Sequence, residues 1–103
     1  MIIKNIEVSR KKNFLHFSMI LSLKTLLKGS FFLRPKVAMV NGNLIEDPEF
    51  LRIKLENLSP GEHLLKTKMP IAQINTFIVS FGIVEEGVRW YEDTLREVKW
   101  NIV

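Results

Sequence analysis

The chain has 103 residues, of which 47% are hydrophobic and 25% are charged, and it contains no cysteine. These values exclude a disordered chain, a disulfide-stapled scaffold and any chemistry that needs a thiolate. They predict a single globular domain that spans residues 1–103.

The charge of the chain is uneven. Residues 1–54 carry ten Lys and Arg against four acidic residues, a balance of +6, whereas residues 55–103 carry five against seven, a balance of −2. A basic half favours an anionic partner, although many basic proteins bind nothing charged. The most apolar window, residues 14–33, is interrupted by His16, Lys24 and Lys28, so no membrane span is predicted. We expect a cytoplasmic protein, and a viral or mobile-element origin is an alternative consistent with the same composition.

Alternating apolar and polar residues predict strands along most of the chain. The clearest alternation covers residues 14–24, where every odd-numbered side chain is apolar. The alternative for this segment is a helix from Asn13, as the N-terminal cap, to Gly29. Further strands are predicted at residues 2–8, 31–40, 44–45, 50–57 and 63–71.

Turn signals separate these strands. Asn41-Gly42 is the strongest hairpin signal, because both residues tolerate positive φ. Ser59-Pro60-Gly61 is a second turn signal. Pro35 lacks an N–H donor, so the strand that contains it should lie at a sheet edge or carry a bulge.

Residues 76–103 predict three strands joined by turns at Glu85-Glu86-Gly87 and Glu92-Asp93-Thr94. This register sets Gly82 opposite Trp90, Trp90 opposite Arg96 and Arg89 opposite Glu97, and it requires a bulge near Gly82. The alternative is a helix over residues 84–102, which would make the fold α+β. Its apolar seam would consist of Val84, Val88, Tyr91, Leu95, Val98 and Ile102.

About eight short strands with turns between them predict an all-β fold, a two-layer antiparallel β-sandwich. The run Leu58–Leu65 resembles a loop and strand of immunoglobulin-like sandwiches. The segments Gly87–Tyr91 and Val98–Ile102 are similar to the last hairpin of such domains. The resemblance implies a fold and a binding or structural role, and the paired cysteines of antibody domains are absent.

The residues that usually carry catalysis are scattered. His16 and His63 are the only histidines, and neither has a carboxylate or second ligand at metal-binding spacing. The acidic pairs Glu85-Glu86 and Glu92-Asp93 fall in predicted turns. We therefore expect no enzyme activity, no cofactor and no metal site.

Seven basic residues are candidate contacts to an anion or a nucleic acid: Arg10, Lys11, Lys12, Arg52, Lys54, Lys66 and Lys68. If strands 50–57 and 63–71 were neighbours, Arg52 would face Lys68 and Lys54 would face Lys66. Such like-charge pairs destabilise a sheet. Either the two strands belong to different sheets, or this face binds an anion.

Two functions follow from these patterns. The first is a noncatalytic protein-interaction or assembly module that binds a protein partner or itself through an edge strand, with Phe31, Phe32 and Leu33 as the candidate interface. The alternative is a nucleic-acid-binding module that uses the basic amino-terminal half.

Overall fold

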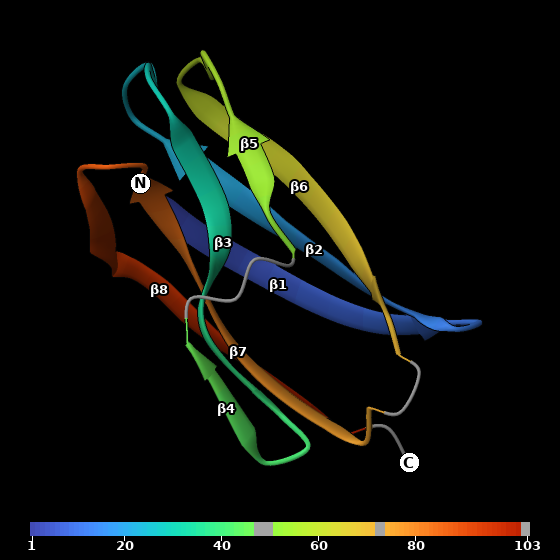
Figure 1. Ribbon diagram of the computed structural model, residues 1–103. Helices are drawn as coiled ribbons and strands as arrows, with labels where there is room; N and C mark the ends of the chain where they lie inside the picture. The colour runs from blue at the N-terminus through green and yellow to red at the C-terminus, as the bar shows by residue number, and fades with distance from the viewer. Residues whose placement is uncertain (47–50, 72–73, 102–103) are drawn as a thin grey trace.

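The computed structural model describes residues 1–46, 51–71 and 74–101, which contain eight strands. Figure 1 shows their arrangement. The all-β prediction is confirmed, and both helical alternatives, at residues 13–29 and 84–102, are wrong because strands occupy most of their described residues and the rest are turns or loop. The strands are β1 (Ile2–Lys11), β2 (Phe14–Leu23), β3 (Phe31–Val40), β4 (Asn43–Glu46), β5 (Ile53–Leu55), β6 (Gly61–Pro70), β7 (Thr76–Glu85) and β8 (Arg89–Asn101).

The strands form two antiparallel sheets that pack face to face (Figure 1). One sheet has the order β1-β2-β6. The other has the order β4-β3-β7-β8. β5 lies on the same side of β3 as β4: it pairs with residues 31–33 of β3, whereas β4 pairs with residues 37–40. The predicted strands at 50–57 and 63–71 thus lie in different sheets, which removes the like-charge pairing considered above. Phe50, the predicted start of the first, lies outside the described residues.

The core lies between the sheets and follows the period of two in the sequence. On β2, Leu15, Phe17 and Met19 are all buried, and so are Leu21 and Leu23. The ring of Phe17 contacts two rings of the opposite sheet, with centroid distances of 5.8 Å to Phe77 and 5.6 Å to Phe81. These aromatic contacts join the two layers.

The β3–β4 hairpin was predicted correctly, including the bounds of β3. Asn41 and Gly42 have φ values of 51° and 80°, as the turn requires. The Asn41 side-chain oxygen also accepts hydrogen bonds from the backbone N–H groups of Asn75 and Thr76, at 2.6 and 3.2 Å. Pro35 lies in a strand with a bulge, because the register shifts between Pro35 and Val37.

The β7–β8 hairpin corrects both predicted turns, and the first lies at residues 86–88, one residue later than predicted, because Glu85 still belongs to β7 and pairs with Arg89. Gly87 has a φ of 75° in the turn. The segment Glu92-Asp93-Thr94 is not a turn, because β8 continues through it and residues 92–95 lie opposite the single residue Gly82. The expected bulge near Gly82 is therefore present.

The shifted first turn and the absence of the second change the predicted cross-strand pairs. Trp90 pairs with Val84 instead of Gly82, and Arg89 pairs with Glu85. The predicted pairs of Arg89 with Glu97 and of Trp90 with Arg96 do not form, because all four residues lie in the single strand β8. The Trp90 ring still reaches Gly82, because a Cβ placed there would lie 3.4 Å from ring atoms of Trp90. The hydroxyl of Thr94 stabilises the bulge: it accepts from the Ile83 N–H at 2.9 Å and donates to the Tyr91 carbonyl at 2.6 Å.

Candidate interaction surfaces

The outer face of the β1–β2–β6 sheet brings together three of the seven predicted basic residues. The register places Ser9 and Lys68 on either side of His16, and Glu7 and Lys66 on either side of Ser18. Lys11 pairs with Phe14 at the end of the same face. We call the residues Ser9, Lys11, His16, Ser18, Lys66 and Lys68 the basic face.

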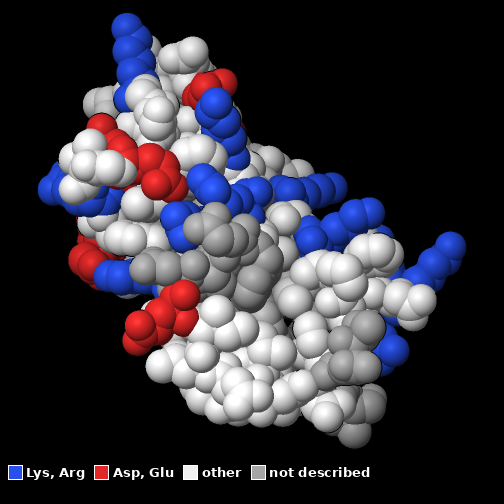
Figure 2. All heavy atoms as spheres, viewed as in Figure 1, with Lys and Arg blue, Asp and Glu red and all other residues white. Residues whose placement is uncertain are grey.

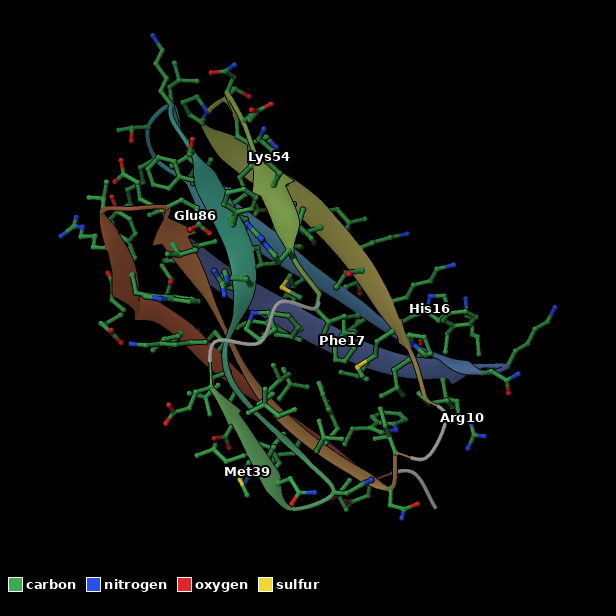
Figure 3. The ribbon with its side chains drawn as sticks, viewed as in Figure 1. Arg10, His16, Phe17, Met39, Lys54 and Glu86 are labelled. Carbon is green, nitrogen blue, oxygen red and sulfur yellow. The ribbon has the colours of Figure 1, made fainter. Side chains whose placement is uncertain are left out.

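The basic face is hollowed. The hollow has a volume of about 690 Å³, and Glu7 is the only carboxylate among the described residues that line it. Arg10 and Lys12 are exposed beside it, at the β1–β2 hairpin. Figure 3 places His16 and Arg10 near this end of the molecule, and Figure 2 shows Lys and Arg side chains projecting on the side where β6 runs.

The cations of the basic face have no acidic partner among the described residues, whereas the candidates Arg52 and Lys54 do. Lys54 pairs with Glu56 at 2.8 Å, and Arg52 pairs with Glu86 at 3.4 Å on the five-stranded sheet. No ion pair is formed by Lys66 or Lys68 within the described part of the chain. Of the two alternatives that the sequence left open, the structure shows the first: Arg52 and Lys54 lie on the other side of the sandwich from Lys66 and Lys68.

A second cluster, on the outer face of the five-stranded sheet, joins cations to aromatic rings. The side chain of Arg34 is only 10% exposed, and it lies 3.3 Å from Glu86 and 5.6 Å from the centroid of the Trp90 ring. Arg52 lies 4.4 Å from the centroid of Phe32. These contacts neutralise and cover the cations, so we assign this cluster to the stability of the sheet.

The predicted interface Phe31, Phe32 and Leu33 is wrong at two of its three positions. Phe31 and Leu33 point into the core and are buried. Phe32 points outward, but Arg52 stacks on its ring. In a strand, three consecutive apolar residues cannot share one face, because successive side chains leave opposite faces.

An exposed apolar surface lies instead at β4 and the adjoining part of β3. Leu44 is 59% exposed, and it lies across from Met39, which in turn lies across from Ile78 on β7. Figure 2 shows the region over β4 with few charged side chains, and Figure 3 places Met39 beside β4. Val37, Met39 and Leu44 share the outer face of the sheet, whereas Ile45 leaves the opposite face, across from the buried Ala38. These four exposed residues, on the two faces of the β4 edge, are called the β4 surface below.

The two histidines have structural surroundings. The His63 Nε2 atom lies 2.7 Å from the Ser59 carbonyl oxygen, which ties β6 to the preceding turn. His16 packs edge-on against Phe14.

The described residues contain neither a metal site nor a helix that could span a membrane. No group of His, Asp and Glu side chains among them could hold a metal ion. In residues 1–46, 51–71 and 74–101 there is also no helix long and apolar enough to cross a membrane. Comparison of the chain with protein-family models, with curated proteins and with solved structures finds no match.

Proposed function

We propose that the chain is a noncatalytic interaction module with an immunoglobulin-like sandwich, and that two copies join through β4. The observation that carries the proposal is the β4 surface, where exposed apolar side chains flank a strand that pairs on one side only within the described sheet. Apolar side chains beside such an edge favour pairing with another strand.

The strand order supports the immunoglobulin-like class. In those domains the strands A, B and E share one sheet, and the strands C, F and G share the other. Here β1, β2 and β6 correspond in order to A, B and E, and β3, β7 and β8 correspond to C, F and G. β4 then takes the place of the extra strand that variable-type domains add beside C.

The hairpin geometry determines which backbone groups β4 offers. In a two-residue hairpin, the residues that flank the turn form a hydrogen-bonded pair, here Val40 and Asn43, and such pairs alternate along the ladder. The N–H and C=O groups of Leu44 and Glu46 therefore point away from β3. They are available to a further antiparallel strand.

A second copy satisfies these groups symmetrically. Opposite residues of an antiparallel pair share a face, so a two-fold axis perpendicular to the sheet can pass between Leu44 and its counterpart. Leu44 would then pack on the other copy's Leu44, and Asn43 would face Ile45. This register keeps the two Glu46 carboxylates apart, so no like charges are opposed.

The proposal is tested by replacing Leu44. We expect the wild-type protein to form dimers in light scattering over a wide dilution series. Leu44→Asp should raise the dimer Kd at least about tenfold, because each copy would bury an unpaired carboxylate.

Leu64 provides the matched control. It is a leucine on β6, in the other sheet, with a similar exposure of 62%. Leu64→Asp adds the same charge and should leave the dimer Kd unchanged. A monomer at every concentration, or equal effects of the two substitutions, would contradict assembly through β4.

A further inference from the structure

Two rings stand beside the lysines of the basic face. Phe14 and His16 are two residues apart on β2, so their side chains leave the same face of the sheet, and their ring centroids are 6.4 Å apart. Both side chains are half-buried. The register places Lys11 next to Phe14 and Lys68 next to His16. Cations thus lie beside rings on this open sheet face, and of the two rings His16 lines the hollow whereas Phe14 does not.

We propose that this face binds single-stranded nucleic acid, with bases stacked on Phe14 and His16 and with phosphates held by Lys11, Lys66 and Lys68. Proteins that bind single strands combine a positively charged groove with aromatic side chains on which bases stack. The site is separate from the assembly surface proposed above, because it lies on the outer face of the other sheet.

The position of Lys68 shows how a base could enter. Its ammonium group lies 4.8 Å from the centroid of the Phe14 ring. A stacked base is generally worth more than a cation over an exposed ring, so the base would displace the ammonium group. The displaced ammonium group can then bind the adjoining phosphate. The hydroxyl groups of Ser9 and Ser18 provide hydrogen bonds to base edges or phosphate oxygens.

The rings and the hollow favour a single strand over other polyanions. A duplex keeps the faces of its bases stacked inside the helix, so it could use the lysines but not the rings. An anionic membrane is a broad surface that would not fill a hollow of about 690 Å³. An acidic protein segment would use the lysines without needing two adjacent rings.

The charge contribution is tested with a fluorescent oligothymidylate of about 15 nucleotides, long enough for one sheet face. Three phosphate contacts predict that log K falls against log salt with a slope of about −2, at about 0.7 per contact. The double variant Lys66→Gln/Lys68→Gln should weaken binding about tenfold at about 0.1 M salt and bring the slope close to −0.7.

The matched control is Lys54→Gln/Lys99→Gln, which removes the same charge from exposed positions on the other sheet. We expect it to change the affinity by less than about twofold, because only local contacts release counterions. If both double variants lost the same affinity for the oligothymidylate, binding would depend only on the net charge of the protein. That result would overturn the proposed site.

The stacking contribution is tested at Phe14. Phe14→Ala should weaken oligothymidylate binding about tenfold without changing the salt slope, whereas Phe14→Tyr should retain the affinity. Circular dichroism checks that each variant is folded. No oligothymidylate binding at about 50 mM salt would overturn the proposal. So would tighter binding to a duplex of the same length or to phosphatidylserine vesicles.

Discussion

Replacement of Phe17 by alanine is expected to lower the free energy of unfolding by about 3–5 kcal/mol, the usual cost of deleting a buried aromatic ring. Phe17 is 1% exposed and contacts Phe77 and Phe81 of the opposite sheet. Its removal would leave a cavity between the two sheets. No strand can move in to fill this cavity without losing backbone hydrogen bonds to its neighbours in the sheet. Urea unfolding followed by tryptophan fluorescence measures the change.

Phe14 gives a control on the same strand. Its side chain is half-buried on the outer face of β2, so Phe14→Ala removes the same atoms without opening the core. We expect it to cost less than half as much as Phe17→Ala. Phe17→Leu, which retains most of the volume, should cost less than about 1.5 kcal/mol. Equal costs at positions 14 and 17 would contradict the assignment of Phe17 to the contact between the sheets.

Replacement of Thr94 by valine is expected to cost about 1–3 kcal/mol, although the two side chains have nearly the same shape. Thr94 is 1% exposed, and its hydroxyl links the Ile83 N–H of β7 to the Tyr91 carbonyl of β8. Valine would leave both backbone groups buried without this partner. The same urea titration measures the loss.

Two further variants separate the hydroxyl from the methyl group. Thr94→Ser keeps the hydroxyl and should retain most of the stability that Thr94→Val loses. Thr76→Val, at an exposed position of β7, should change the free energy of unfolding by less than about 0.5 kcal/mol. If serine were as destabilising as valine, packing of the methyl group and not the hydrogen bonds would explain the role of Thr94.

The strands could be predicted because their burial repeats every second residue. In β2, and in β7 from Phe77 to Ile83, the side chains that face the core are apolar, and the Asn41-Gly42 turn fixes the register of the hairpin that follows β3. The register of β8 could not be predicted in the same way. The sequence pattern required a bulge near Gly82, but it did not show that residues 92–95 continue the strand, because the hydrogen bonds of the buried Thr94 hydroxyl hold them there.

The candidate sites were only partly readable from the sequence. The sequence identifies the basic residues, but it does not show which sheet carries each of them. The sheet determines their surroundings, because Lys66 and Lys68 line one hollow whereas Arg52 and Lys54 pair with carboxylates. The β4 surface was hidden for another reason. Leu44 and Ile45 form too short a run to stand out, and their exposure depends on β4 lying at the end of the described sheet.

The bulge in β8 limits how far assembly can proceed. In the proposed dimer, β4 of one molecule pairs with β4 of the other, so this sheet edge is occupied in both copies. Assembly through β4 therefore stops at the dimer. Continued growth of this sheet beyond the proposed dimer would need β8 of one dimer to pair with β8 of the next. The bulge at residues 92–95 interrupts the regular backbone of β8, so a further strand would pair poorly with this edge. We therefore expect the protein to remain a dimer even in concentrated solution.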